Sequence, residues 1–582
     1  MSNPIETDVL IVGAGPAGAS AAVFLAPYGL RTIMICRHPC SADTPRAHIT
    51  NQRAMEAFRD AGLEPEITRR ASPAAHIEHT FWLRSMGGEE LARTHSWGND
   101  PQRIGDYAAG SPCEMCDLPQ TELEPILVGE AARRGVKVRF DTELIDFEQD
   151  ADGVTARIRD RLTGGEFDIR ARYMIGADGA RSRIVEKLGI PLTGMSGLGD
   201  VFNVLCDVDL EHHVRFRHGS LYSVIQPGSS QWAPVGVFRM VKPWNQWLVG
   251  LIVPPTADRP EPTQEEFKQR IQELIGDPDI PVEILSTSVW SVNDLVADYY
   301  RDGRIFCMGD AVHRHPPTNG LGSNTCVQDA FNLAWKLGLV ANGKADEALL
   351  ESYNAERQPV GKQIVARANK SMAQNNLVWD LLGGGMRSEP CEGGHETVFE
   401  TPEGREQLRC EIDKMRFEYH AHGVEMNRRY VSGAIVPGDG EAPEYERNPE
   451  LYYQPSTWPG SSLPHVWLGD RNDGRQTSTL DVAGKSRFML FTGPGGDAWR
   501  SAADELSEEF GVEIAVTSIG AYQDYEDSYR RWHEVSGIAE DGCVLARPDL
   551  IVAWRCGDAP DDPVAALRAA MASILGLTEA TA

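Results

Sequence analysis

Residues 8–18 read Asp8-Val-Leu-Ile-Val-Gly13-Ala-Gly15-Pro-Ala-Gly18, and this stretch decides the fold of the first part of the chain. Its apolar opening is typical of a buried parallel strand, residues 19–25 are typical of a small-residue helix, and residues 31–36 predict a second strand. In such a βαβ unit Gly13 allows a tight turn, Gly15 lets the backbone approach a pyrophosphate, and Gly18 lets the helix pack closely on the strand. We therefore expect a dinucleotide-binding domain with its ligand phosphates at this turn.

One expected partner of that ligand is missing from its usual position. The second strand of a dinucleotide fold commonly ends in an acidic residue that binds the ribose hydroxyls. Here the strand ends at Cys36, followed by Arg37, and the nearest acid is Asp43. Either Asp43 binds the ribose or the ribose is held in another way, and we favour the second interpretation.

Two further motifs narrow the ligand. The first is Gly176-Ala-Asp178-Gly-Ala-Arg-Ser-Arg183, and the second runs from Gly303 through Asp310 and the Gly-rich turn at 316–324 to Lys336. An Asp at the end of a buried strand can accept a hydrogen bond from a ribityl hydroxyl, and a Gly-rich turn that opens a helix offers amides to a flavin ring. The turn residues concerned are Pro317, Gly320, Gly322 and Asn324.

The composition excludes several classes of protein. A chain of 582 residues is too long for one hydrophobic core, and its formal net charge of −29 disfavours nucleic acid and anionic membranes as partners. Eleven cysteines without a paired framework predict a reducing, cytoplasmic location. The apolar stretch at 9–26 follows acidic residues and is broken by glycines and a proline, so we predict neither a signal peptide nor a membrane span.

The pattern of elements predicts an α/β protein with a Rossmann-like nucleotide-binding domain interrupted by an antiparallel sheet. A compact α/β unit closes the chain, with a strand at 487–492, a helix at 498–510 capped by Asp497, and strands at 544–547 and 550–554. The expected domains are the first part of the nucleotide domain, a substrate-binding sheet, the second part of the nucleotide domain, a connecting region and a C-terminal domain, at 1–190, 191–297, 298–382, 383–460 and 461–582.

In this order, the three motifs resemble those of the class A flavoprotein aromatic hydroxylases, which are single-component FAD monooxygenases. The resemblance covers about residues 5–370. Within the class, Pro45-Arg-Ala-His48-Ile-Thr-Asn-Gln-Arg and the turn at 317–324 look most like chlorophenol hydroxylases of the 2,4-dichlorophenol 6-monooxygenase type. The 2-hydroxybiphenyl 3-monooxygenases and phenol 2-monooxygenases are similar over the same stretch. The end of the chain is similar to the thioredoxin-like tail of that group, but it carries no CxxC motif and so implies no thioredoxin chemistry.

The resemblance also implies roles for individual residues. Arg46 and Gln120 should contact FAD, Asp310 should bind its ribityl chain, and Asp178 belongs to a motif associated with both FAD and NAD(P)H. The arginine usual three residues after the serine of that motif is Val185 here, so the nicotinamide contacts stay open. No second dinucleotide fold is predicted, and the family implies a transiently docked NAD(P)H, with NADPH favoured.

The reaction that the resemblance implies is the ortho-hydroxylation of a phenol, chlorinated or aryl-substituted, to a catechol. NAD(P)H reduces the flavin, O₂ adds at its C4a position, and the hydroperoxide transfers one oxygen atom. A phenol with a pKa near 10 is only about 0.1% ionised at pH 7, so a positioned base is valuable. Our candidate for the catalytic base is His48, because histidine titrates near the working pH. A buried histidine that satisfies the backbone near the flavin is the alternative.

Several other interpretations remain open at this stage. Cys113 and Cys116 are spaced closely enough to act as the redox pair of a flavin-dependent disulfide reductase. A larger aromatic, polyketide-like substrate and a non-enzymatic flavin-binding role are further alternatives. His313 and His315 form an HxH pair, but no third ligand has matching spacing, and we predict no metal. The expected partners are a small phenolic substrate and O₂, and we expect a homo-oligomer, a dimer or a tetramer.

Overall fold

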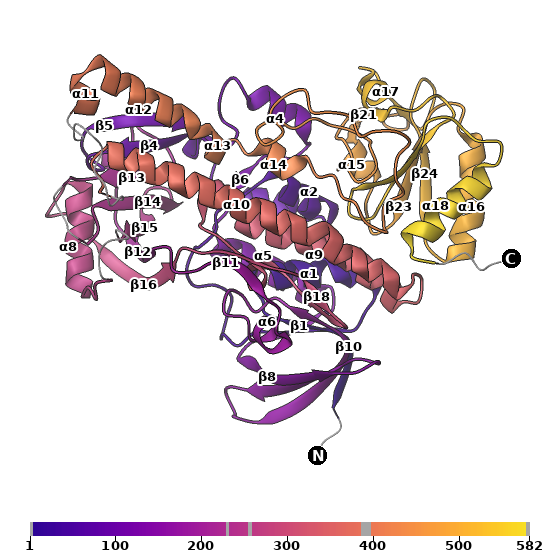
Figure 1. Cartoon of the computed structure of the whole chain (residues 1–582), viewed down its shortest axis with the longest axis horizontal. Helices are drawn as coiled ribbons and strands as arrows, with labels where there is room; N and C mark the ends of the chain where they lie inside the picture. Colours follow the sequence, from indigo (N-terminus) through magenta and orange to yellow (C-terminus); the bar gives the residue numbers. More distant parts are fainter. Residues whose placement is uncertain (1–3, 228–231, 254–258, 386–396, 578–582) are drawn as a thin grey trace.

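The computed structural model of the chain describes residues 4–227, 232–253, 259–385 and 397–577. Three bodies can be followed in Figure 1: a nucleotide-binding domain in the centre, a second sheet with helix α8 on the left, and a C-terminal domain on the right. Two long helices, α9 (Gly322–Ala341) and α10 (Glu351–Leu381), belong to the central body. The mixed α/β architecture predicted from the sequence is confirmed.

The central sheet is built on the N-terminal βαβ unit. Strand β1 (Ile5–Val12) pairs in parallel with β2 (Thr32–Ile35) and β10 (Glu166–Gly176), and helix α1 (Pro16–Leu25) connects β1 to β2. The strand order is β18-β19-β10-β1-β2-β7. Its remaining strands are β7 (Lys137–Arg139), β18 (Arg301–Asp302) and β19 (Ile305–Cys307), with β8 (Thr142–Gln149) and β9 (Val154–Asp160) attached to β10. Because β19 returns beside β10 after residue 300, the Asp310 segment lies near the glycine turn.

The second sheet has seven strands in the order β16-β12-β15-β14-β13-β4-β5. Five of them lie in the predicted sheet region: β12 (Asp200–Asp207), β13 (Leu221–Ile225), β14 (Val235–Lys242), β15 (Gln246–Ile252) and β16 (Glu283–Ser291). The other two, β4 (His79–Leu83) and β5 (Glu90–His95), come from within residues 1–190, and β4 pairs in parallel with β13. The sheet therefore draws on two separate stretches of the chain, while the division into domains stays a prediction.

The two faces of this sheet pack against different helices. Phe267, Ile271 and Leu274 of α8 (Gln264–Ile275) share a core cluster with one set of strand residues. The opposite side shares a cluster with the end of α10 and with α12 (Pro402–Lys414). The stretch expected as a connecting region thus contains helices in its first half, namely α11 (Thr397–Glu400), α12, α13 (Arg416–Tyr419) and α14 (His422–Met426).

The C-terminal domain has the thioredoxin-like connectivity predicted for it. Its sheet has the order β24-β23-β26-β27, with β23 parallel to β24 and antiparallel to β26. The prediction of Asp497 as a helix cap is wrong, because α16 begins at Asp497 and the N-cap is Gly496. Along the chain the elements are β23 (Phe488–Thr492), α16 (Asp497–Phe510), β24 (Ile514–Ser518), α17 (Arg531–Ser536), β26 (Cys543–Ala546), β27 (Val552–Cys556) and α18 (Pro563–Ile574).

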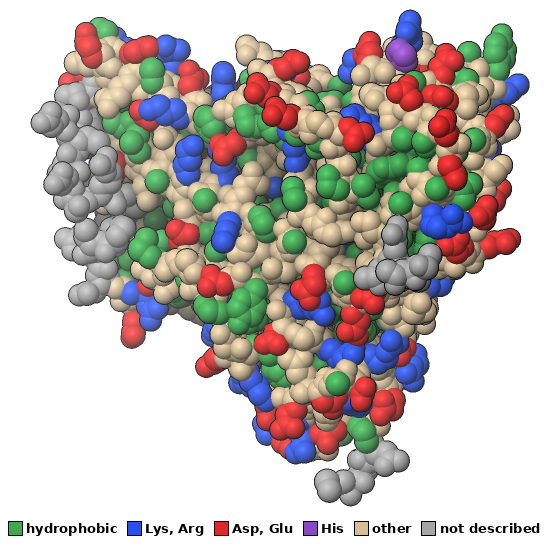
Figure 2. Space-filling view, turned by 45° about the vertical axis from the view of Figure 1, so that its right-hand side comes forward, with side chains coloured by type: hydrophobic (Ala, Val, Ile, Leu, Met, Phe, Trp, Pro, Cys, Tyr) green, Lys and Arg blue, Asp and Glu red, His purple; other side chains and the backbone are tan. Residues whose placement is uncertain are grey.

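The surface shown in Figure 2 mixes acidic and basic side chains. Both kinds are dense on the lower lobe, where β9 and β10 carry exposed cross-strand ion pairs such as Arg157–Asp168 and Arg159–Glu166. Such exposed pairs contribute little to stability because solvent screens their charges. Among the described residues, no helix combines the length and apolar character needed to cross a membrane.

Candidate active site

The glycine turn has the geometry that a bound pyrophosphate requires. A Cβ on Gly13, whose φ is +111°, would lie 2.1 Å from the carbonyl oxygen of Ala177, and a Cβ on Gly18 would lie 2.0 Å from the carbonyl oxygen of Gly13. These two glycines let the turn, β10 and α1 approach closely. Gly15 is the N-cap of α1, and the nearest atom to a Cβ there is Glu124 Oε1 at 3.8 Å. The space in front of the α1 amides is therefore open to an anion.

Beside this turn lies the corner where a ribose-binding acid was missing from the sequence pattern. Cys36 is half-buried at the end of β2, and Asp43 is exposed. The acid nearest to the turn is Glu124 on α5 (Gln120–Arg133), which is buried and accepts a hydrogen bond from the amide of Ala42 at 2.6 Å. Burial raises the pKa of Glu124, whereas Gln120 and Ala42 oppose that shift. Glu124 is a residue that the sequence reasoning did not identify.

Arg46 and Gln120, both expected to contact FAD, lie on either side of this corner. Arg46 is exposed, and its charge acts on Glu124. The backbone amide of Gln120 donates to the carbonyl oxygen of Ala47 at 2.7 Å, and its side chain donates to Glu124 Oε1 at 2.5 Å. The structure therefore links Gln120 directly to Glu124, which faces the glycine turn, and places Arg46 within electrostatic reach of Glu124.

Asp178 and Asp310 end neighbouring strands of the central sheet. Asp178 follows β10, and its Oδ2 accepts from the amide of Arg183 at 2.9 Å, at the start of α6 (Arg183–Leu188). Its Oδ1 is buried and has no hydrogen-bond partner among the described residues. Asp310 follows β19 in a short turn, and its side chain is exposed. Asp178 Oδ1 and the exposed Asp310 carboxylate are thus the atoms that could accept hydroxyl or amide donors from a ligand.

The Gly-rich turn that opens α9 presents backbone rather than side chains. Asn319 and Gly320 adopt positive φ angles of +64° and +62°, and Pro317 is exposed while Gly322 is half-buried. Asn324, by contrast, is buried: its Oδ1 accepts from the amide of Asn51, and its Nδ2 donates to the carbonyl oxygen of Ile49. Asn324 therefore ties the strand after His48 to this turn and can offer only its backbone to a ligand.

His48 lies at the junction between the two sheets and belongs to a buried triad with Asp117 and Arg239. His48 precedes β3 (Ile49–Thr50), Asp117 ends the paired strand β6 (Cys116–Asp117), and Arg239 lies on β14. Nδ1 of His48 is 3.3 Å from Asp117 Oδ1, and Arg239 donates to Asp117 Oδ2 at 2.7 Å. All three residues are 9% exposed or less, so their charges interact through a medium with little water.

The electrostatics of the triad favour a neutral histidine beside a charged aspartate. Burial lowers the pKa of His48, and Arg239 lowers it further, whereas Asp117 opposes the shift. Burial alone would raise the pKa of Asp117, but Arg239 and His48 outweigh it and leave this pKa below its ordinary value. Nδ1 is the ring nitrogen paired with the carboxylate, a placement that favours a proton on Nδ1 and an acceptor at Nε2.

The triad borders an apolar cluster. Ile49, directly after His48, shares this cluster with Trp97 and Tyr419, whose rings meet edge-on at 5.2 Å. A Cβ on Gly320 would lie 3.2 Å from Ile49 Cβ and 3.6 Å from the Trp97 ring. The Gly-rich turn, the segment that carries the base candidate, and aromatic side chains therefore meet in one place.

The surroundings of the two cysteines and of the histidine pair are those of structural residues. Cys113 and Cys116 are free and buried, and burial raises the pKa of both thiols, which disfavours the thiolate that disulfide chemistry needs. His313 Nε2 lies 3.0 Å from Asp329 Oδ2, and His315 Nδ1 contacts its neighbouring backbone carbonyl. Among the described residues, Glu78, His79 and His95 bring potential ligand atoms together at the sheet surface, and the absence of a bound metal stays a prediction.

A nucleotide-type glycine turn, a Gly-rich turn at the start of α9 and a buried histidine are the features expected of a flavin-dependent oxygenase. The comparisons agree: the family described as FAD binding domain matches residues 6–368, and the family described as aromatic-ring hydroxylase, C-terminal, matches residues 456–577. The chain therefore belongs to the FAD-binding aromatic hydroxylases and is an FAD-dependent monooxygenase.

Relatives of known activity extend over the full length of the chain. It is 48% identical to a 2,4-dichlorophenol 6-monooxygenase from Cupriavidus pinatubonensis strain JMP 134, over 99% of this chain and 97% of the relative. It is 41% identical to a phenol 2-monooxygenase from Pseudomonas sp. strain EST1001, over 97% of this chain and 92% of the relative. The solved flavin-dependent monooxygenase PieE, in complex with FAD and substrate, matches with a TM-score of 0.93 and 43% identity, over 99% of this chain and 100% of that structure.

Proposed function

We propose that this enzyme hydroxylates a phenol at the position ortho to its hydroxyl group, using NADPH and O₂. The observation that carries the proposal is the buried triad of His48, Asp117 and Arg239 beside the apolar cluster of Ile49, Trp97 and Tyr419. The names of relatives at 48% and 41% identity over almost the whole chain support a phenolic substrate.

His48 serves as the base that accepts the phenolic proton. A phenol with a pKa near 10 requires roughly 4 kcal/mol to ionise at pH 7, and its phenolate is the electron-rich form that accepts an electrophilic oxygen. Nε2 of His48 takes the proton, while Asp117 holds Nδ1 and stabilises the resulting imidazolium. Arg239 keeps Asp117 ionised, so the aspartate remains an acceptor throughout.

Bound FAD supplies the redox and oxygen-activating chemistry. The glycine turn would hold its pyrophosphate, Asp310 and Asp178 would offer carboxylates to it, and the Gly320 turn would offer amides. Trp97 and Tyr419 keep water away from the ring that reacts. NADPH docks transiently, and the exposed Arg181 beside Asp178 supports a preference for its extra phosphate.

The test is a panel of substituted phenols, with NADPH oxidation and catechol formation measured together for the parent enzyme and for His48→Ala. We expect catechol from at least one simple or chlorinated phenol, and a rate in His48→Ala reduced by about 100-fold or more, the usual contribution of a positioned base. Oxidation of NADPH without catechol for every phenol would contradict the proposal.

A fused-ring phenol is a second candidate substrate. A tetracenomycin A2 monooxygenase-dioxygenase from Streptomyces glaucescens is 33% identical over 99% of this chain, and the solved aklavinone-11 hydroxylase matches with a TM-score of 0.81. Because the phenol monooxygenases are the more similar relatives, single-ring phenols remain the primary proposal. One polyketide-type phenol in the panel distinguishes the two.

We also propose a homodimer or tetramer in the cytoplasm. The ten cysteines in the described part of the chain are free thiols, which fits a reducing compartment. Light scattering on the purified enzyme tests the assembly.

A further inference from the structure

Asp329 on α9 accepts a hydrogen bond from the backbone of the turn that carries Asp310. Asp329 Oδ2 accepts from the amide of Gly309 at 3.2 Å and lies 3.0 Å from His313 Nε2, while Oδ1 accepts from Arg357 Nε at 2.7 Å. Burial alone raises the pKa of Asp329, but Arg357 and His313 outweigh it and leave the pKa lowered. The shape of this flavin-binding turn therefore depends on a buried negative charge.

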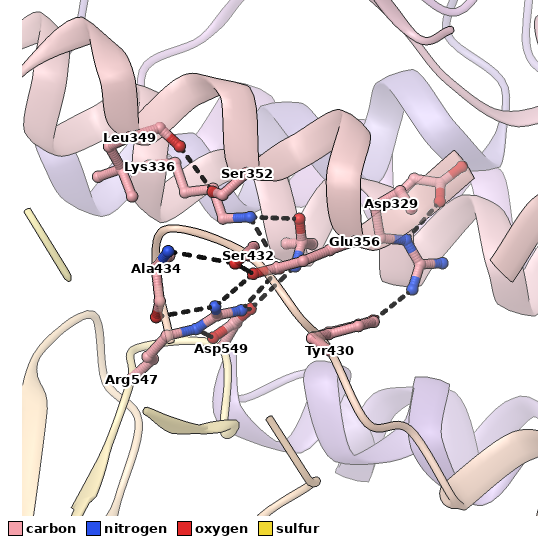
Figure 3. Close-up of polar contacts among 12 residues, drawn as sticks. Asp329, Lys336, Leu349, Ser352, Glu356, Tyr430, Ser432, Ala434, Arg547 and Asp549 are labelled. Carbon is pink, nitrogen blue, oxygen red and sulfur yellow. Dashed lines mark hydrogen bonds and ion pairs between the residues drawn. The ribbon is translucent and has the colours of Figure 1, made fainter. Parts of the chain in front are cut away.

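Arg357 in turn is bonded to a segment that belongs with the C-terminal domain. Its NH1 donates to Tyr430 Oη at 2.6 Å. The amide of Tyr430 donates to the carbonyl oxygen of Gly460 at 2.9 Å. The amide of Gly460 in turn donates to the carbonyl oxygen of Val552 on β27 at 2.7 Å. Three successive hydrogen bonds thus lead from Arg357 to the C-terminal sheet, and Figure 3 shows Tyr430 and Asp329 at one end of this region.

A second cluster lies one residue away, around Glu356. Arg547 of the C-terminal domain donates to Glu356 Oε1 at 2.6 Å and Oε2 at 2.9 Å, and it also binds Asp549. On the α9 side, Lys336 Nζ donates to Glu356 Oε2 at 2.8 Å. Figure 3 shows Glu356 between Lys336 and the Arg547–Asp549 pair. The same carboxylate therefore joins α9, α10 and the C-terminal domain.

The charges of the two clusters balance. Lys336, Arg357 and Arg547 are matched by the three carboxylates of Asp329, Glu356 and Asp549, and all six side chains are 3% exposed or less. Burying six charges is costly, and well-packed apolar residues would often hold two domains together at least as firmly. What such a network adds is a fixed register, because each charge has one position in which it is paired.

We propose that the C-terminal domain acts as a retention element for FAD, in which Tyr430 and Arg547 are positioning residues that hold the Gly309–Asp310 turn. They act on α9 and α10 through Arg357 and Glu356 and do not contact the turn themselves. The proposal rests on the FAD binding shown by the family and not on the proposed substrate, so its test needs no phenol.

The experiment is a titration of apoprotein with FAD, combined with hydrogen–deuterium exchange of residues 305–326. Tyr430→Phe removes one hydroxyl and leaves the fold otherwise intact. A double variant, Glu356→Gln with Arg547→Gln, removes one charge of each sign and keeps the network neutral. We expect Kd for FAD to rise about threefold in Tyr430→Phe, as for the loss of one buried hydrogen bond. In the double variant we expect about tenfold, with faster exchange in 305–326.

Arg568→Gln is the matched control, because Arg568 pairs with Glu505 and Glu509 on the exposed face of the same domain. It should leave both Kd and exchange unchanged. Unchanged Kd and exchange in the other variants would overturn the proposal, as would an equal weakening of FAD binding in Arg568→Gln. If the double variant does not fold, Tyr430→Phe decides the question by itself.

Discussion

Asp117→Asn removes the charge that faces His48 while keeping the shape of the side chain. Two unit charges about 4 Å apart interact by about 4 kcal/mol at an effective dielectric constant of about 20. His48 Nδ1 and Asp117 Oδ1 are 3.3 Å apart, which is close to that distance. A change of one pKa unit corresponds to about 1.36 kcal/mol. Losing the Asp117 charge should therefore lower the pKa of His48 further. The rate of proton removal should fall at least about tenfold, which corresponds to about 1.4 kcal/mol.

The assay is the pH dependence of kcat/KM for the best phenol of the panel. Since neutral His48 is the active form, the acid limb of the profile reports its pKa, and in Asp117→Asn this limb should move to lower pH while the plateau falls. Arg239 is left without its carboxylate and also lowers the pKa of His48, so a double variant with Arg239→Gln should move the limb back. An acid limb at the same pH in the parent and Asp117→Asn would refute the reasoning.

Three other predictions follow from buried or crowded positions. Gly13→Ala places a Cβ 2.1 Å from a carbonyl oxygen, so FAD should bind at least about tenfold more weakly by titration, whereas Gly15→Ala should fold normally. Cys113→Ser with Cys116→Ser should keep phenol-dependent NADPH oxidation, and its loss would revive the reductase alternative. Burial raises the pKa of Glu425 to about 7, so its contribution to stability is present at low pH and is lost as pH rises through 7. The free energy of unfolding in urea should fall between pH 6 and 8.5, with about 1 kcal/mol of the fall due to Glu425, so Glu425→Gln should reduce the fall by that amount. A remainder should persist, because burial also raises the pKa of Glu418 to about 7.

Local sequence patterns predicted the parts of the structure that are made of contiguous residues. The βαβ unit at 8–36 follows from hydrophobic runs and three glycines, and a helix was expected to follow the Gly-rich turn at 316–324. The strands β4 and β5 were missed because β4 pairs with β13, more than 100 positions away, and β5 joins the sheet through β4. A sequence pattern indicates that a strand exists, but not which sheet it joins.

In the candidate site, too, local patterns predict some residues, whereas residues brought in from distant strands are missed. His48 could be proposed from its residue type and its place in a motif, whereas Asp117 and Arg239 lie on other strands and carry no motif of their own. Glu124 had a weak signal, since it lies one helical turn after Gln120 in α5, which predicts that both side chains share a face. Asn324 was predicted to bind the cofactor, yet its side chain is committed to the backbone of Ile49 and Asn51.

The central claim is that His48 deprotonates a bound phenol, and the ionisation state of the ligand tests it directly. A chromophoric phenol, whose neutral and ionised forms absorb at different wavelengths, is titrated with pH while bound to the FAD-loaded enzyme. We expect the bound ligand to ionise at lower pH in the parent enzyme than in solution. In His48→Ala the pKa of the bound ligand should return toward the solution value by at least one unit, or about 1.4 kcal/mol. The same bound pKa in both proteins would contradict the account.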